Sequence, residues 1–143
     1  MIKKKYIIKL IKLSKNDNLF TNLLSDYFKE LGNNKIIKKK IFKYFSSEKK
    51  IFLIKIDTLV VGFICLSFFK GITNNKICLI NDFYIIKKCR RNYIASKVIQ
   101  KIYAFYKKRK YEIRIEIMKH NLNALKFWKK FNIYLRSQTF IIK

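Results

Sequence analysis

The sequence predicts one α/β domain of the mixed, α+β kind. Its 143 residues are close to the usual size of a single domain, and half of them are hydrophobic, which is enough to build a core. Segments typical of strands and segments with helical spacing follow one another in the order β-α-α-β-β-β-α-β-α-β. Because no linker, repeat or low-complexity block interrupts this order, residues 1–143 are expected to form a single domain.

The N-terminal part is predicted to hold one strand and two helices. The apolar segment 5–13 has the length and composition of a strand. Segment 14–32 starts with polar capping residues and ends at Gly32 in the position that follows a helix, and segment 36–45 repeats the helical pattern. The apolar stripe of the first helix consists of Leu19, Leu23, Leu24, Tyr27, Phe28 and Leu31.

Three strands are predicted in the middle of the chain. Segments 51–57 and 59–69 flank Asp57 and Thr58, a short hairpin turn. After a loop at 70–76, segment 77–86 is nearly all apolar, which is typical of a buried strand.

The C-terminal part alternates again between the two types of element. Segment 94–108 carries a wide apolar stripe and predicts a helix, whereas 111–118 alternates isoleucines with charged residues and predicts a strand. Segment 123–131 predicts a short amphipathic helix. The tail at 133–142 is expected to add one or two strands.

The formal net charge of +26 makes this a strongly basic protein. Such a charge attracts nucleic acid and anionic surfaces. Here, however, the lysines are dispersed along the whole chain together with many Ile, Asn, Phe and Tyr residues, the profile that AT-rich codons produce. A nucleic-acid-binding module needs a clustered basic face, so nucleic acid is not expected as a specific ligand.

Cysteine and apolar patterns indicate a cytoplasmic protein without a metal site. Cys65, Cys78 and Cys89 are odd in number and show no metal-ligand spacing, and His120 is the single histidine. The apolar run at 59–69 is too short to span a bilayer as a helix, so no membrane partner is expected.

The segment from strand to helix at 82–96 is a candidate anion site. The first N–H groups of a helix have no intrahelical acceptor, and together with the helix dipole they bind phosphate. Arg90 and Arg91 add positive charge, but this turn lacks the glycines that usually allow close approach of an anion. The alternative is a solvated turn that carries two arginines.

Three motifs resemble the GNAT acetyltransferase superfamily. The segment "INDFYIIKKCRRNYIASKVIQ" (80–100) is similar to its acetyl-CoA-binding strand-turn-helix, in which [QR]-x-x-G-x-[GA] opens the helix. Arg90 falls on the first position and Ala95 on the last, while Tyr93 stands where the family has its first glycine. The segments "EIMKHNLNALKFWKKFNI" (116–133) and "DTLVVGFICL" (57–66) also resemble family segments, in family order.

The resemblance implies a GNAT-like, mostly antiparallel central sheet of six to seven strands flanked by about four helices. It also implies acetyl-CoA as co-substrate, with the backbone amides of 91–96 around the pyrophosphate. The edge of the 82–86 strand would hold the pantetheine arm, with Asn121 hydrogen-bonded to it. The cofactor-binding residues that follow from the resemblance are Phe83, Ile85, Arg90, Arg91, Asn92, Tyr93, Ile94, Ala95, Ser96, Asn121, Ala124 and Trp128.

The resemblance also implies catalytic roles. A main-chain N–H near Phe83 and Tyr84 would polarise the thioester carbonyl. Glu116 is the first candidate for the base and Asp82 the second. The alternatives are an ion pair of Glu116 with Arg114 or a lysine, and a structural hydrogen bond of Asp82.

The proton donor is less clear from the motifs, because Trp128 occupies a position where the family often has tyrosine. An indole N–H can donate only a hydrogen bond. Either the thiolate leaves unaided or through water, or another phenol such as Tyr84 or Tyr134 serves as the acid. The alternative for Trp128 is an anchor in the core. His120 is expected in a surface loop, with a proton relay as the alternative.

The expected function is therefore N-acetyl transfer from acetyl-CoA to a primary amine of a small molecule, or to a protein N-terminus or lysine. Direct attack in a ternary complex is expected, since no Cys-His pair suggests a covalent intermediate. The alternative is an inactive GNAT-like domain that binds acyl-CoA or a partner. The protein is expected to be a monomer or a homodimer.

Overall fold

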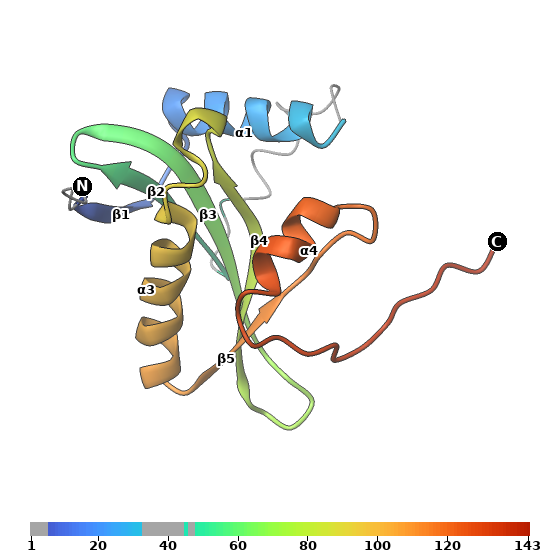
Figure 1. Cartoon of the computed structure of the whole chain (residues 1–143). Coiled ribbons are helices and arrows are strands. Elements are labelled where there is room, and N and C mark those ends of the chain that lie inside the picture. Colours follow the sequence, from blue (N-terminus) through green and yellow to red (C-terminus); the bar gives the residue numbers. More distant parts are fainter. Residues whose placement is uncertain (1–5, 33–44, 46–47) are drawn as a thin grey trace.

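The computed structural model describes residues 6–32, 45 and 48–143. A five-stranded sheet in the order β1-β2-β3-β4-β5 forms its centre (Figure 1). All neighbouring strands are antiparallel except β4 and β5, which are parallel. The strands are β1 (Ile8–Leu13), β2 (Lys49–Ile56), β3 (Leu59–Lys70), β4 (Lys76–Ile85) and β5 (Tyr111–Ile115). The predicted mixed α/β class with a mostly antiparallel sheet is thus confirmed.

Helices cover both faces of the sheet (Figure 1). Helix α1 (Asn18–Glu30) contributes its buried residues to one apolar cluster, whereas α3 (Ile94–Lys108) and α4 (Leu122–Trp128) contribute to a second cluster. A short 3-10 turn, η1 (Lys87–Cys89), connects β4 to the turn before α3. The two clusters take alternate residues of β3, because neighbouring side chains of a strand point to opposite faces.

Local capping chemistry sets the ends of α1. The Asp17 side chain accepts a hydrogen bond of 2.7 Å from the Phe20 N–H, and Gly32 follows the helix at φ +76°. The apolar stripe differs from the prediction in two positions, because Leu19 and Leu31 are exposed. Phe20 is fully buried instead, since it shares one helix face with the buried residues that follow at intervals of three and four.

The predicted hairpin between β2 and β3 is confirmed. Ile56 pairs with Leu59, so Asp57 and Thr58 alone form the turn. Asp57 has a φ of +53°, a left-handed conformation that Asp tolerates better than most residues.

Strand β4 pairs with β3 along its whole length but with β5 only in its first half. Its register with β3 shifts between Cys65–Asp82 and Leu66–Ile80, which leaves Asn81 as an extra residue, a β-bulge. The parallel pairing with β5 ends at the same place, with Ile80 opposite Ile115. Residues 81–85 therefore leave β5, and among the described residues no strand pairs with their edge on that side.

The C-terminal part differs from the prediction. The described sheet has five strands instead of six to seven, because the segment 133–142 forms no strand and is exposed throughout. It pairs with no strand among the described residues, and an isolated extended segment lacks the partner that a strand needs. β5 ends at Ile115 rather than at 118, and α4 ends at Trp128 rather than at 131.

Two further expectations concern helices. The second helix predicted at 36–45 lies outside the described residues except for Phe45. Three α-helices and one 3-10 turn are described, against about four helices expected. None of the described helices combines the length and the hydropathy that crossing a bilayer requires.

Gly62 is expected to be essential for the contact between β3 and β4. A Cβ atom built at this position lies 2.0 Å from the main-chain oxygen of Tyr84, so Gly62→Ala must displace the backbone of β4. We expect the substitution to lower the free energy of unfolding by about 1–3 kcal/mol, measured by urea denaturation.

Gly32→Ala is the control for this experiment. Its Cβ meets no atom within 4 Å, although the φ of +76° disfavours a side chain. A loss of about 1 kcal/mol is expected from that conformation alone. An unchanged midpoint for Gly62→Ala would contradict the steric argument.

Candidate functional site

The N-terminus of α3 presents main-chain donors at the end of β4. The first helical hydrogen bond of α3 runs from the Lys97 N–H to the Tyr93 carbonyl at 3.0 Å. The N–H groups of residues 94–96 therefore precede the helical ladder, and the Tyr93 side chain does not cap them. Together with the helix dipole, these three groups can bind an oxyanion.

The turn before α3 reaches this geometry without glycine. Arg91 and Tyr93 both adopt left-handed conformations, with φ of +65° and +60°. The side chain of Tyr93 projects into solvent, with 75% of its surface exposed. The tyrosine at the usual glycine position is therefore accommodated, at a conformational cost of about 1–2 kcal/mol.

Arg90 holds this segment to the rest of the fold. Its Nε donates to the Ile85 carbonyl at 2.7 Å, and its Nη2 donates to Glu30 Oε2 of α1 at 2.7 Å. The guanidinium also lies over the Tyr84 ring, 5.4 Å from the centroid. Arg90 thus connects the end of β4 to the end of α1 in this structure, while Arg91 and Asn92 are exposed.

On one face of β4, aromatic side chains line the space beside the departing strand. The Phe83 ring lies 6.1 Å from Phe127 and 6.3 Å from Trp128, both on α4. Trp128 is buried and belongs to the core cluster, which agrees with its interpretation as a core anchor. Ile94 is also buried there, so only its main chain can contact a ligand.

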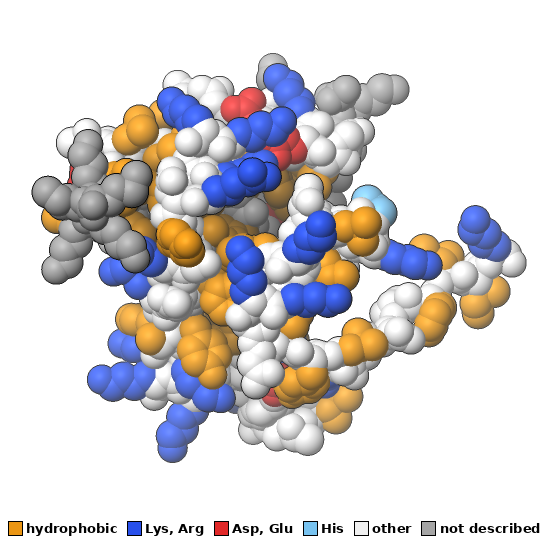
Figure 2. Space-filling model, viewed as in Figure 1, with side chains coloured by type: hydrophobic (Ala, Val, Ile, Leu, Met, Phe, Trp, Pro, Cys, Tyr) orange, Lys and Arg blue, Asp and Glu red, His pale blue; other side chains and the backbone are white. Residues whose placement is uncertain are grey.

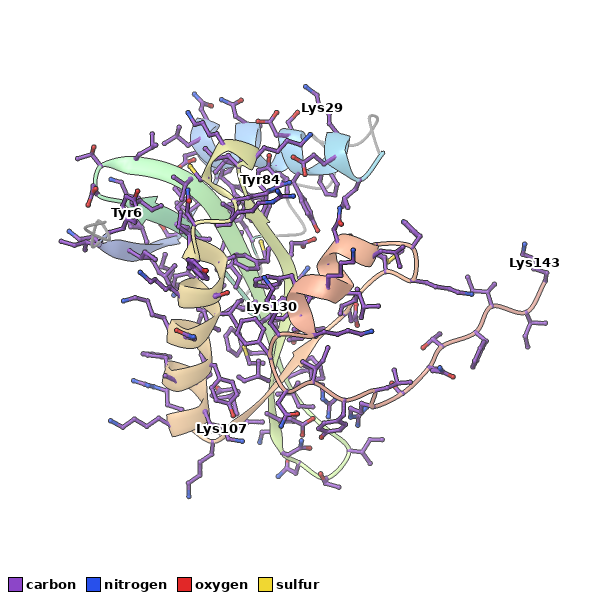
Figure 3. All side chains as sticks on the ribbon, viewed as in Figure 1. Tyr6, Lys29, Tyr84, Lys107, Lys130 and Lys143 are labelled. Atoms are coloured by element: carbon purple, nitrogen blue, oxygen red, sulfur yellow. The ribbon has the colours of Figure 1, made fainter. Side chains whose placement is uncertain are left out.

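The opposite face of β4 carries polar groups that point toward α1. The Tyr27 hydroxyl donates a 2.9 Å hydrogen bond to Asp82 Oδ1, and the Tyr84 hydroxyl lies 3.4 Å from Glu30 Oε1. Figure 3 shows Tyr84 between α1 and the sheet. Asp82, Tyr84 and Arg90 are therefore brought together with Tyr27 and Glu30. The sequence did not predict these two as site residues.

Burial sets the protonation of both tyrosines. It raises the pKa of Tyr27 far above its usual range, and the neighbouring Asp82 carboxylate raises it further. Burial also raises the pKa of Tyr84, Glu30 adds to this effect, and Arg90 opposes it. Both hydroxyls consequently remain protonated near neutral pH and act as hydrogen-bond donors.

The sequence contained only part of the signal for these contacts. Tyr27 belongs to the apolar stripe that the sequence predicts for the first helix. Its ring does pack there, 5.6 Å from the ring of Phe63. Its hydroxyl reaches Asp82, which is 55 positions away in the chain. A tyrosine in a stripe of Leu and Phe is a weak sign that a buried polar partner exists.

The predicted residues after β5 lie on the connection to α4. Glu116 is exposed and directly follows β5, and Arg114 donates to Glu112 at 2.6 Å rather than pairing with Glu116. The Asn121 side chain accepts a 3.1 Å hydrogen bond from the Ala124 N–H and so caps α4. Glu116 therefore lies just beyond the last β4–β5 pair, Ile80 and Ile115, and Ala124 packs against the core.

Other chemistry has less support in the described residues. They contain no group of three or more side chains that could hold a metal ion. The His120 and Tyr134 side chains are exposed. Lysine and arginine side chains are scattered over the visible face rather than gathered in one patch (Figure 2).

Replacing the two left-handed residues by glycine is expected to stabilise the turn. Tyr93→Gly and Arg91→Gly should each raise the free energy of unfolding by about 1–2 kcal/mol, because glycine adopts the left-handed conformation without strain. The added freedom of glycine in the unfolded chain should offset about 0.5–1 kcal/mol of this gain. The measurement is the midpoint of urea unfolding.

Asn92→Gly supplies the matched control, because Asn92 lies between the two and is not among the residues with positive φ. This variant is expected to lose about 0.5–1 kcal/mol. A loss of stability in all three variants would show that the turn does not hold the left-handed conformations.

Several solved structures of acetyltransferases share this fold. A possible acetyltransferase from Clostridium difficile 630 superposes with a TM-score of 0.80 at 18% identity, over 96% of this chain and 97% of that one. A predicted acetyltransferase with acetyl-CoA from Clostridium acetobutylicum gives 0.74 at 16% identity, over 96% of each chain. An aminoglycoside acetyltransferase from an uncultured soil metagenomic sample, in complex with sisomicin, gives 0.73 at 17% identity, over 95% and 94%.

These structural likenesses are to proteins of low identity and show the fold alone, and no curated protein matches the sequence. The family model does match: acetyltransferase (GNAT) family, over residues 18–133. That range contains the strand-turn-helix segment, the β2–β3 hairpin and the segment around Asn121, on which the resemblance rested. The chain therefore belongs to the acetyltransferase (GNAT) family.

Proposed function

We propose that this chain is a single-domain N-acetyltransferase that transfers the acetyl group of acetyl-CoA to a primary amine by direct attack in a ternary complex. The observation that carries the proposal is the departure of β4 from β5 after Ile80. It leaves the main chain of 81–85 open on one side and leads directly to the N-terminal amides of α3.

The donor set in this region fits acetyl-CoA, which supplies a thioester-activated acetyl group when bound. The N–H groups of residues 94–96 match a pyrophosphate, and the exposed Arg91 adds positive charge. The open edge of 81–85 offers main-chain groups to the amides of a pantetheine arm, and the family resemblance assigns Asn121 a hydrogen bond to the same arm. The fold neighbour from Clostridium acetobutylicum holds acetyl-CoA, which supports the assignment.

Asp82 is the base that the geometry favours, with Glu116 as the second candidate. Asp82 is partly buried and follows the bulge at Asn81, where β4 opens. The Tyr27 hydroxyl donates to Oδ1 and so restricts the orientation of the carboxylate, which in this proposal takes a proton from the ammonium group of the acceptor. Glu116 is exposed, so its carboxylate lacks such a constraint.

Two groups complete the proposed chemistry. A main-chain N–H of β4 near Phe83 and Tyr84 donates to the thioester oxygen, where negative charge develops during attack. Tyr84, whose hydroxyl stays protonated, donates a proton toward the leaving thiolate. Trp128 packs in the core and takes no part in proton transfer.

The cysteines support direct transfer. Burial raises the pKa of Cys78 to about 12 and raises that of Cys65 well above its usual value, so both remain weakly nucleophilic thiols. Cys65, Cys78 and Cys89 are all unpaired, which fits a reducing compartment, and we propose the cytoplasm.

The acceptor is a primary amine on a small molecule or on a protein. The fold neighbour in complex with sisomicin is an aminoglycoside acetyltransferase, which is one precedent for a small amine on this fold. The net charge of +26 disfavours highly cationic acceptors at long range, whereas Asp82, Glu30 and Asp26 lie on the α1 side of the site.

Binding of acetyl-CoA tests the cofactor site directly. Asn92→Glu places a carboxylate in the exposed turn before α3 and should weaken binding roughly tenfold or more, measured by calorimetry at low and at moderate salt. The control is Gln100→Glu, which adds the same charge at an exposed position farther along α3. Equal loss in both variants, or binding that disappears with salt, would mean that net charge alone attracts the cofactor.

Variants of the two acids test the proposed base, with CoA thiol release as the readout and a panel of primary amines as acceptors. Asp82→Asn should lower kcat by about 10²–10⁴-fold and Glu116→Gln by much less. Tyr27→Phe keeps the ring packing but removes the hydrogen bond to Asp82, so kcat should fall with little change in the binding of acetyl-CoA.

The reverse order, with Glu116→Gln inactive and Asp82→Asn active, would move the base to the residue that follows β5. Tight binding of acetyl-CoA without thiol release from any amine would instead indicate an inactive GNAT-like domain.

A further inference from the structure

Asn81 and Asp82 point to the same face of the sheet, although neighbouring residues of a strand normally point to opposite faces. The Asp82 carboxylate accepts a hydrogen bond from Tyr27 of α1. The Asn81 carboxamide meets the Ser67 hydroxyl of β3, and Ser67 lies two positions beyond Cys65, which belongs to the cluster on the α1 side. The bulge explains this arrangement, because Asn81 is the extra residue at the register shift between β3 and β4.

Ser67 determines which end of the Asn81 side chain remains available. Its hydroxyl donates to Asn81 Oδ1, so the Nδ2 group and its two N–H donors point away from that contact. Among the described residues, none accepts a hydrogen bond from Nδ2. Nor is Nδ2 among the buried polar atoms of the described residues that lack a partner, so it reaches solvent although Asn81 is half-buried. The α1 face of β4 therefore presents an oriented donor directly beside Asp82.

The position of this donor beside the proposed base limits the acceptor. In the proposed transfer the Asp82 carboxylate takes a proton from the ammonium group, so the amine nitrogen lies next to Asp82. The substituent on the neighbouring carbon of the acceptor then comes near the adjacent side chain on the same face, Asn81. An N–H group there pairs with an oxygen lone pair, whereas an alkyl group leaves it without a partner and a second ammonium group offers only further donors.

We propose that Asn81, oriented by Ser67, is a specificity-determining residue that hydrogen-bonds an oxygen atom on the carbon next to the one that bears the acceptor amine. The inference rests on the proposed acetyl transfer, and it narrows the acceptor to amines with a neighbouring hydroxyl or carbonyl oxygen. Amino alcohols and the N-termini of peptides have this chemistry, whereas alkyl amines and lysine side chains lack it. Such acceptors carry a single positive charge at the reacting end, which suits a chain with a net charge of +26 better than a polycation does.

The first test compares amines of matched shape, with CoA thiol release at saturating acetyl-CoA as the readout. Ethanolamine is paired with propylamine, and glycinamide with isobutylamine. For each pair the ratio of kcat/KM, oxygenated amine over alkyl amine, is measured in the native chain and in Asn81→Leu. Differences in intrinsic nucleophilicity between amines cancel in this comparison. Asn81→Leu removes the donor and should lower the ratio roughly tenfold for at least one pair.

Ser67→Ala tests the positioning role of Ser67 with a smaller change to the sheet. The Nδ2 donor remains, but nothing fixes the carboxamide, so the ratio should fall roughly threefold through a higher KM for the oxygenated amine. Ser67→Thr is the matched control, because it retains the hydroxyl, and it should keep the native ratio. A purely structural role of Ser67 in the bulge would instead change the kinetics of both amines of a pair equally and leave the ratio unchanged.

The outcomes separate this inference from the proposed function. Ratios that are equal in the native chain and in Asn81→Leu would overturn the role of Asn81, even though the chain acetylates amines. A ratio that falls in Asn81→Leu for ethanolamine alone would assign the site to amino alcohols, and one that falls for glycinamide alone would assign it to peptide N-termini. The absence of thiol release with all of these amines would overturn the acetyl transfer and this inference together.

Discussion

The arrangement of the site depends on the point at which β4 stops pairing with β5. Parallel pairing ends at Ile80 and Ile115, and the extra residue Asn81 bulges from β4 at the same place. A bulge bends its strand and increases the local twist, so it separates the two strands from there on. Gly62 of β3 permits this path, because its missing side chain leaves room for the Tyr84 carbonyl.

After the bulge, successive side chains of β4 point to opposite faces of the sheet and make different contacts there. Phe83 packs with Trp128 on the α4 side, whereas Asp82 and Tyr84 meet Tyr27 and Glu30 on the α1 side. The main-chain edge of β4 is open on the side where β5 pairs with the earlier half of the strand. An apolar wall, a main-chain edge and a hydrogen-bonded carboxylate therefore lie within four consecutive residues.

The contacts of individual basic side chains shape the site more than the total charge of the chain does. Arg90, expected to bind phosphate, is held by Glu30 and by the Ile85 carbonyl. These two contacts of Arg90 instead fix the turn that precedes α3, so the anion site that we propose uses main-chain amides and helix polarity. Main-chain donors are independent of side-chain identity, and this explains how a turn with Tyr93 in place of glycine can retain the geometry.

The sequence by itself determined the local elements and the family. Periodicity predicted the strands from β1 to β5 and three helices, while Asp57–Thr58 and Gly32 marked a turn and a helix end, because these signals act over a few residues. Only the tertiary structure decided which side chains meet. Tyr27 and Asp82 are 55 positions apart, and Glu30 and Arg90 are 60 apart, so no local pattern could pair them. The tail shows the same limit: its residues favour a strand, but a strand also requires pairing with a neighbour, and residues 137–142 pair with no described strand.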